Sequence, residues 1–312
     1  MRNAFINALT AVAARDPRIM FLTADLGYKL FDDFARRYPG RFMNVGVAEA
    51  NMAGVAGGLA LEGKKPFIYS ITPFATLRCY EQIRNDICYH EAEVTVVGVG
   101  GGYSYGPNGP THHALEDIGV MRMLPNMTIL CPGDPAETVA AVNAIAEHRG
   151  PVYLRLGRAG EMVVHPGPVS LKIGQSFTLR EGNDVAILST GNMLATAMAV
   201  AERLAPSGIA ARVVSMPTVK PLDVATVDRA ARETRAVVTL EEHVLAGGFG
   251  AAVAEHLADA GLVTRFRRFG AADRFAHICG DQEFHREANG LTAPQIEAAV
   301  RALLQPPAAA RG

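Results

Sequence analysis

The sequence predicts an α/β protein with two doubly wound domains, at residues 1–165 and 175–312. Its 312 residues exceed the roughly 100–200 residues of one ordinary domain. Short apolar runs alternate with segments of helical period through both halves, which is typical of parallel strands covered by helices on both faces. The composition agrees, because 49% of the residues are apolar, only 7% are aromatic and 31 are glycine. Such a composition favours closely packed layers.

The first half opens with a helical pattern over residues 3–14 and a buried strand over 19–23. A later helix, over residues 47–61, is dense in Ala and Gly, which allow backbones to approach closely at the expense of helix propensity. We therefore expect this helix to be central and buried. The same alternation predicts the other elements of this half: a helix over 30–38, strands over 66–70, 94–99, 127–131 and 152–156, and helices over 77–89 and 135–147.

A boundary between the domains is predicted near His165-Pro166-Gly167-Pro168, where turn-forming residues cluster without periodicity. The alternation then starts again. It predicts strands over 185–189, 211–215, 236–240 and 263–269, and helices over 194–204, 224–231, 250–260 and 294–304.

Charge and cysteine content exclude several classes of protein. The 30 basic and 31 acidic side chains leave a net charge of −1, which gives no support to nucleic-acid binding. The four cysteines are widely spaced and show neither zinc-ligand spacing nor a disulfide framework. We recognise no signal peptide and no apolar run of the roughly 20 residues that a membrane helix needs. We expect a cytoplasmic protein that binds no membrane.

The common nucleotide and hydrolase motifs fail. The glycine-rich stretch Gly98–Tyr103 follows a predicted strand, but the last glycine of G-x-G-x-x-G falls on Tyr103 and no helix follows directly. The sequence contains neither a P-loop nor a G-x-S-x-G elbow.

Three segments carry residues with chemical potential. Glu49 is a lone carboxylate at the start of an apolar helix, where it either complements the helix dipole or forms a buried acid with a raised pKa. His112 and His113 follow a Gly-Pro turn beyond a strand, where functional residues gather in parallel sheets. Phe74, Leu77 and Tyr80 form an apolar stripe at helical spacing, which by itself is more often core than cofactor contact.

Taken together, these segments resemble the C-terminal half of transketolases that depend on thiamine diphosphate. The matching segments run in order along nearly the whole chain: Thr23–Leu26, Gly46–Glu49, the aromatic stretch 74–80, Gly109–His112, Leu156–Arg158, and Glu241–His243 with Gly247–Gly250. Each segment is a weak signal, but their order and spacing are specific. The resemblance implies a pyrimidine-binding domain over 1–165 and a transketolase C-terminal domain over 175–312.

The resemblance also implies roles for cofactor-binding residues. Glu49 matches the glutamate that bonds the aminopyrimidine ring and favours the imino tautomer, whose nitrogen removes the thiazolium C2 proton. Phe74, Leu77 and Tyr80 match the wall around this ring, with Leu77 where many transketolases have another aromatic residue. Asp25 matches an aspartate near the cofactor at the subunit interface. Glu49 and His112 are the expected catalytic residues.

Substrate recognition is expected to differ from that of ordinary sugar-phosphate transketolases. His112 matches the histidine that faces the sugar hydroxyls and carbonyl, with His113 and Glu116 as neighbours. Arg158 and Arg2 match the two phosphate-binding arginines, whereas Lys29 and Gly100 stand where a serine and a histidine are usual. Asn108 replaces an aspartate, and Asn can donate as well as accept hydrogen bonds. We expect an anionic sugar, phosphorylated, branched or sulfonated, and an altered acceptor range.

The resemblance implies that this sequence corresponds to only one half of a transketolase. In this family a separate N-terminal domain holds the diphosphate and Mg²⁺, and we find no segment for it in this sequence. We therefore expect the C-terminal subunit of a split transketolase of carbohydrate metabolism, with the metal and diphosphate held mainly by the partner in an α₂β₂ heterotetramer. No metal ligands are expected in this chain.

Three alternatives stay open. A β subunit of a 2-oxo acid dehydrogenase shares the two-domain plan and the glutamate, but needs a lipoyl partner and no sugar-phosphate clamp. A deoxyxylulose-phosphate-synthase-like enzyme is another relative, usually a single chain with both halves. A catalytically silent regulatory subunit is the third, and the presence of Glu49, Phe74 and His112 argues against it.

Overall fold

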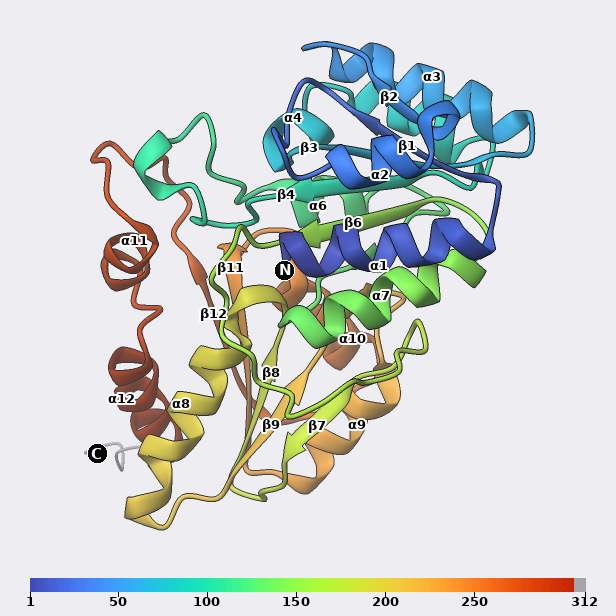
Figure 1. Ribbon diagram of the computed structural model, residues 1–312. Coiled ribbons are helices and arrows are strands. Elements are labelled where there is room, and N and C mark those ends of the chain that lie inside the picture. Colours follow the sequence, from blue (N-terminus) through green and yellow to red (C-terminus); the bar gives the residue numbers. More distant parts are fainter. Residues whose placement is uncertain (306–312) are drawn as a thin grey trace.

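The computed structural model describes residues 1–305 and shows two twisted sheets, one above the other in Figure 1. The first sheet has seven strands in the order β10-β5-β6-β4-β3-β1-β2, and the second has five in the order β12-β11-β8-β9-β7. The predicted fold class, two mainly parallel α/β layers, is confirmed. None of the helices among these residues combines the length and the apolar composition that crossing a membrane requires.

The first sheet is parallel except at one edge, where β10 runs antiparallel to β5. Its inner strands are mainly apolar because both faces are covered, and every residue of β1, β4 and β6 is buried, including Arg155 of β6. The strands are β1 (Ile19–Thr23), β2 (Phe42–Asn44), β3 (Lys65–Ile71), β4 (Thr95–Val99), β5 (Thr128–Leu130), β6 (Val152–Leu156) and β10 (Thr218–Lys220).

Helices cover both faces of the first sheet. On one face, α1 (Arg2–Arg15), α2 (Asp32–Arg37) and α7 (Pro135–Glu147) share a core with the strands. On the other face lie α3 (Glu49–Leu61) and α6 (Asp117–Arg122). A Cβ at Gly57 of α3 would lie 2.9 Å from the carbonyl oxygen of Asp86, so this glycine permits close packing. The expectation of a central, buried helix is right for this side of α3 only, because Asn51, Gly58 and Leu61 on its other side are exposed.

The second sheet is covered in the same way. Helices α8 (Leu194–Leu204) and α12 (Ala293–Leu304) pack on one face, and α9 (Val224–Glu233) and α10 (Phe249–Asp259) lie on the other. The strands are β7 (Phe177–Arg180), β8 (Val185–Ser189), β9 (Ala211–Ser215), β11 (Ala236–Val244) and β12 (Arg265–Ala271).

The two sheets share one hydrophobic core. It runs from α3 and α6 to Leu188, Met216 and Phe249 of the second half. Strand β10 also reaches across, because it belongs to the second half of the chain and pairs with β5 of the first sheet. The boundaries 1–165 and 175–312 stay a prediction.

The helix predicted over 77–89 is right only in part, because residues 77–79 form a turn and the helical segment starts at Tyr80. The structure has α4 (Thr72–Thr76), then α5 (Tyr80–Gln82) and a π-helical turn, η2 (Ile83–Cys88). Thr72 and Pro73 start the first helix early, directly after β3. Helix α11 (Gln282–Ala288) and the short strands β2, β7 and β10 were also missed.

A buried ion pair links α6 to strand β6 of the first sheet. The Arg155 guanidinium donates to both carboxylate oxygens of Asp117, at 2.7 and 3.2 Å, and the Tyr153 hydroxyl donates to the same carboxylate at 2.6 Å. The Arg155 and Asp117 side chains are 4% and 1% exposed. Each charge is therefore stable here only because the other is present.

We expect Asp117→Asn to lower the free energy of unfolding by about 3–5 kcal/mol, since it leaves the Arg155 charge buried without a carboxylate. Urea denaturation followed by circular dichroism measures this. Asp33→Asn is the control, because Asp33 pairs with Arg36 and Arg37 at the surface and should cost less than about 1 kcal/mol. Equal losses in the two variants would contradict the argument.

Candidate active site

The candidate active site lies at the carboxyl edge of the first sheet. The five adjacent strands β6, β4, β3, β1 and β2 are mutually parallel, so their carboxyl ends meet at one edge. The segments that leave these ends carry the predicted residues Arg158, His112, Phe74, Asp25 and Glu49, in that strand order. This is where parallel sheets place their ligands.

Glu49 is the first residue of α3, and its side chain is only 2% exposed. Its carboxylate accepts a hydrogen bond from the Ser70 hydroxyl at 3.0 Å and from the Arg78 guanidinium at 2.8 Å. The helix N-terminus adds a favourable dipole. Glu49 is thus a buried carboxylate held on two sides, not a solvated helix cap.

A chain of side-chain contacts leads from Glu49 across the edge. The Arg78 guanidinium lies 4.7 Å from the ring centroid of Phe74, and the Phe74 ring meets the His112 ring edge-on at 5.3 Å. On its other side His112 faces Tyr105 at 6.4 Å, and the Arg158 guanidinium lies 5.2 Å from that tyrosine ring. The structure therefore brings Glu49, Phe74, His112 and Arg158 into one cluster.

Asp25 supports the turn that leads into α3. Its backbone N–H donates to the Asn44 side-chain oxygen at 3.0 Å, and the Asn44 amide donates back to the Asp25 carboxylate at 3.0 Å. The same Asn44 oxygen accepts from the Gly46 N–H at 3.0 Å. Lys29, on the following loop, is exposed and lies near the Tyr28 ring, with its Nζ 5.6 Å from the centroid.

The aromatic stripe divides where the helix breaks. Phe74 belongs to α4 and joins the cluster, whereas Leu77 follows the end of this helix and is 44% exposed. Tyr80 begins α5, and its hydroxyl donates to the carbonyl oxygen of Val120 at 2.9 Å. This bond holds Tyr80 against α6.

The two adjacent histidines point in different directions. His112 is half-buried beside Phe74, whereas His113 is 5% exposed and its Nε2 lies 3.0 Å from the Gly106 carbonyl oxygen. Asn108 is exposed at the end of the short turn η3 (Gly106–Asn108). Glu116 directly precedes α6, its side chain accepts a hydrogen bond from the Leu115 N–H at 3.2 Å, and burial raises its pKa.

Arg2 is half-buried at the start of α1, and its Nε is buried without a hydrogen-bond partner among residues 1–305. Beside Arg158, a cavity of about 670 Å³ lies between the loop after β4 and the second half of the chain. Its lining includes Ser104, Asn192 and Arg286. The cationic side chain of Arg158 thus faces a space large enough for a small polar ligand.

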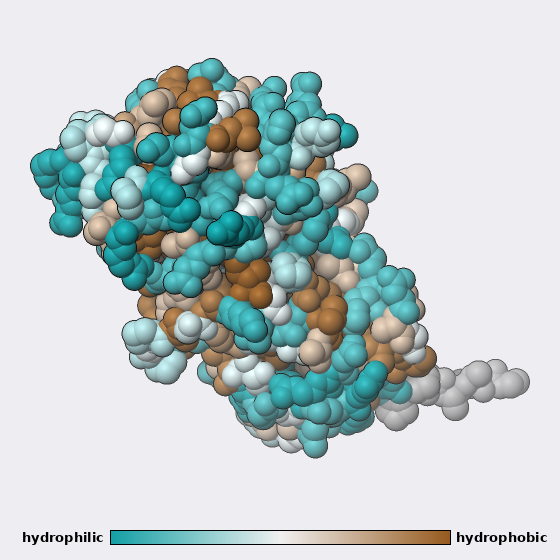
Figure 2. All heavy atoms as spheres, turned by 90° about the vertical axis from the view of Figure 1, so that its right-hand side faces the viewer, coloured by the Kyte–Doolittle hydropathy of each residue, from teal (hydrophilic) through white to brown (hydrophobic). Residues whose placement is uncertain are grey.

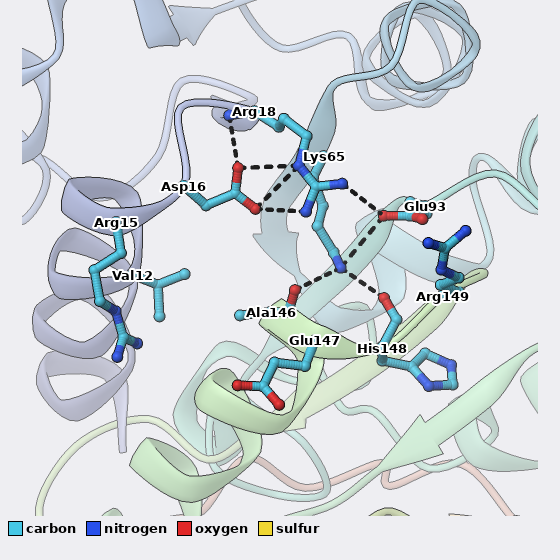
Figure 3. Close-up of a pocket in the computed structure, with 10 residues that line it drawn as sticks. All are labelled: Val12, Arg15, Asp16, Arg18, Lys65, Glu93, Ala146, Glu147, His148 and Arg149. Atoms are coloured by element: carbon cyan, nitrogen blue, oxygen red, sulfur yellow. Dashed lines mark hydrogen bonds and ion pairs between the residues drawn. The ribbon is translucent and has the colours of Figure 1, made fainter.

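A second pocket, of about 420 Å³, lies at the opposite, amino-terminal edge of the first sheet and contains none of the predicted site residues (Figure 3). Its buried Lys65 ammonium donates to the carbonyl oxygens of Ala146 and His148 at 2.8 and 2.6 Å and pairs with Glu93 at 3.4 Å. Burial lowers the pKa of Lys65. Since its ammonium is bound by two carbonyl oxygens and paired with Glu93, Lys65 joins β3 to the end of α7 rather than presenting a charge to a ligand.

Sequence reasoning missed three residues of the cluster: Ser70, Arg78 and Tyr105. Arg78 follows Phe74 at helical spacing, which is a usable signal. Ser70 and Tyr105 carry no sequence signal, because their roles follow from strand register and loop shape. Within residues 1–305, no group of three or more His, Cys, Asp or Glu side chains is placed to hold a metal ion.

The fold and the position of the cluster define a class, and comparison with known proteins agrees. Residues 1–160 match the family described as transketolase, pyrimidine binding domain, and residues 174–296 match transketolase, C-terminal domain. The chain belongs to the transketolase family.

Similar proteins come from split transketolases. The chain is 41% identical to the 6-deoxy-6-sulfo-D-fructose transketolase subunit SqwH of Clostridium sp. (strain MSTE9), over 95% of this chain and 92% of the relative. It is 37% identical to a subunit of the apulose-4-phosphate transketolase of Phocaeicola vulgatus, over 83% of each chain. A solved split gene transketolase, an inactive β4 tetramer, superimposes with a TM-score of 0.90 at 41% identity, covering 97% of both chains.

The Glu49–Arg78 pair predicts a measurable coupling. Arg78→Ala should lower the free energy of unfolding by about 1–2 kcal/mol, since it leaves a buried carboxylate without its cation, although Arg78 itself is half-exposed. In a Glu49→Gln background the same change should cost less than about 0.5 kcal/mol, because a neutral amide needs no counter-charge. Urea denaturation of the four variants measures this cycle. Additive losses would show that the pair is not coupled.

Proposed function

We propose that this chain is the C-terminal, pyrimidine-binding subunit of a split thiamine-diphosphate-dependent transketolase. It would transfer a two-carbon ketol unit from an anionic ketose to an aldose acceptor. The observation that carries the proposal is the buried Glu49 carboxylate at the start of α3, joined through Arg78 to the Phe74 and His112 rings. A buried acid beside a flat ring fits an aminopyrimidine, which offers a ring nitrogen and an aromatic face.

In this proposal each of the residues near the cofactor has a separate role. Thiamine diphosphate, when bound, supplies the nucleophilic carbon that carries the two-carbon unit. Glu49 would exchange a proton with a nitrogen of the pyrimidine ring through a hydrogen bond, and its burial would keep that hydrogen bond from being screened by water. Phe74 limits the space for the ring, with Leu77 and Tyr80 nearby in sequence, and Asp25 supports the turn before Glu49.

Substrate binding is assigned to the loop after β4 and to the cations around it. His112 can donate a hydrogen bond to a sugar oxygen on which charge develops. Asn108 would contact the acceptor, with His113 holding the loop from inside. Arg158, with Arg2 and Lys29, would attract an anionic group. The names of the two relatives refer to a sulfonated and a phosphorylated sugar, which supports an anionic substrate here.

A partner subunit is part of the proposal. It would supply the diphosphate and Mg²⁺ sites in an α₂β₂ heterotetramer. The side of α3 away from the core supports this, because Asn51, Gly58 and Leu61 are exposed on it and a Cβ at Gly58 would meet no atom within 4 Å. Val47, just before the helix, is exposed as well. Figure 2 shows hydrophobic side chains gathered near the top of the molecule, the end that holds α3 in Figure 1. Two exposed apolar side chains flanking a glycine fit close contact with another helix.

We also propose a cytoplasmic location. Cys79, Cys88, Cys131 and Cys279 are all unpaired in the part of the chain that the structure describes. Burial raises the pKa of the first three thiols to about 12, so they stay protonated and inert.

Glu49→Gln tests the catalytic role. In the reconstituted complex it should lower kcat for ketol transfer by about 10²–10⁴-fold, the usual size of acid–base catalysis, because Gln can form the hydrogen bond but cannot exchange the proton. Steady-state assays with thiamine diphosphate and Mg²⁺ measure this. Glu62→Gln, at the exposed end of the same helix, should keep full activity. A Glu49→Gln enzyme with wild-type kcat would refute the role.

The partner requirement is tested by co-expression with a diphosphate-domain transketolase subunit from the same genome. We expect the isolated chain to show no turnover and the complex to transfer ketol units from a panel of ketose donors. Native mass measurement gives the stoichiometry. Turnover by the isolated chain would contradict the split arrangement. Transfer from a 2-oxo acid to a lipoyl domain, or condensation of pyruvate with an aldose phosphate, would identify one of the alternative enzymes instead.

A further inference from the structure

The loop between β4 and α6 is closed at its base and opens toward the candidate site. Gly102 and Ala114 form an isolated antiparallel bridge, with both N–H···O bonds at 2.9 Å. The segment between them carries Asn108 and His112 at its far end. Because the bridge fixes both ends of the loop, whatever fixes the bridge also determines where His112 lies.

Glu242, on β11 of the second sheet, lies directly against this base. Its carboxylate accepts the Tyr103 backbone N–H at 2.6 Å, and its side chain is fully buried. A Cβ at Gly102 would collide with Glu242 Oε1, and the φ of Gly102 is +68°, so only glycine allows this approach. The Glu242 side chain thus occupies the space that a side chain at position 102 of the loop would need.

The carboxylate of Glu242 is held in turn by α11. The Arg286 guanidinium donates to Glu242 Oε2 at 2.5 Å, and the Gln282 amide donates to both oxygens at 2.8 and 3.1 Å. The Arg286 side chain is 11% exposed, so the pair is largely shielded from water. These bonds fix the orientation of the Glu242 carboxylate, and in this orientation the carboxylate accepts the Tyr103 N–H.

The same helix covers the inner side of the loop. The His285 ring stacks on Tyr103 with a centroid distance of 4.8 Å and meets His113 edge-on at the same distance. The Asn289 amide donates to the Tyr103 hydroxyl at 3.1 Å. In Figure 1 the loop, in teal, lies beside α11, in red. His113 is therefore packed inside the loop, against His285 and the Gly106 carbonyl oxygen. Of the two histidines, only His112 contacts Phe74 of the cluster.

We propose that Glu242 is a positioning residue for His112, an inference that rests on the proposed function. Glu242 touches neither the cluster nor Arg158, Arg2 or Lys29, and its own cation is Arg286. It acts through the Tyr103 backbone and the Gly102–Ala114 bridge, so that the second half of the chain sets the place of the substrate-facing histidine. His112 itself is held only lightly, by Thr111 Oγ1 at 3.0 Å from its Nδ1 and by the rings beside it.

The kinetic test uses the reconstituted complex. Glu242→Ala should lower kcat/KM for the aldose acceptor at least about tenfold, and Glu242→Gln, which keeps an acceptor for the Tyr103 N–H, should lower it less. The matched control is Glu233→Ala, because Glu233 also pairs with a largely buried arginine, Arg212, at 2.7 Å, but is 50% exposed and lies on α9, outside the lining of the cavity beside Arg158. It should change kcat/KM less than about twofold. Wild-type kinetics in both Glu242 variants would overturn the proposal.

A double-mutant cycle separates positioning from general support of the fold. If Glu242 acts through His112, then Glu242→Ala should cost no more than about twofold in a His112→Ala background. The dissociation constant of thiamine diphosphate should stay unchanged, since Glu49 and Phe74 are on other elements. Losses that multiply in the double variant, or a weakened cofactor affinity of the same size, would overturn the proposal.

Amide hydrogen exchange gives a readout that does not depend on activity. Both Glu242 variants should raise exchange selectively within residues 102–114, whereas Glu233→Ala should not. Should Glu242→Ala not fold, Glu242→Gln carries the test. Unchanged exchange in this segment, or a rise spread evenly over the second sheet, would overturn the proposal. If the wild-type complex transfers no ketol unit, the proposed function fails, while the exchange pattern still judges the role of Glu242.

Discussion

One buried guanidinium connects the parts of this protein on which the candidate site depends. Arg155, on β6, binds the Asp117 carboxylate of α6, and it also donates to the carbonyl oxygens of Ala114 and Glu242, at 2.8 and 3.0 Å. These four residues belong to the first sheet, the helix after the loop, the loop itself and the second sheet. A buried cation must satisfy its donors with fixed partners. Arg155 therefore holds the two halves of the chain together at the base of the loop.

The candidate site combines a rigid side with an open one. Glu49 is buried and bonded to Ser70 on the adjacent strand β3, so its position is determined by the sheet. Arg78, Leu77 and Arg158 are exposed to a large degree, and the outer side of α3 is exposed as well. This asymmetry is what one half of a shared site would show: the acid is preorganised, whereas the surface around it is left for a second chain to cover.

Much of the fold could be predicted because it depends on local patterns. The strands at 19–23, 152–156, 185–189 and 211–215 are mainly apolar and have the predicted bounds, as does the helix at 135–147, whose N-cap Asp134 and Pro135 mark its start. Short elements at edges could not be predicted. Strand β10 has only three residues, and it exists because β5 offers it an antiparallel partner far away in sequence.

The candidate site, like the fold, could be predicted only where it depends on local sequence patterns. Sequence alone singled out Glu49, Phe74, His112 and Arg158, because each follows a recognisable strand or lies in a segment that resembles a family, and the parallel sheet then brings them to one edge. Sequence alone did not reveal Arg78 as the partner of Glu49, the separation of His112 from His113, or Glu242 beneath the loop. Those depend on which side chains meet across strands and domains. Such contacts are determined by packing and by the pairing of buried charges, and a local sequence pattern encodes neither.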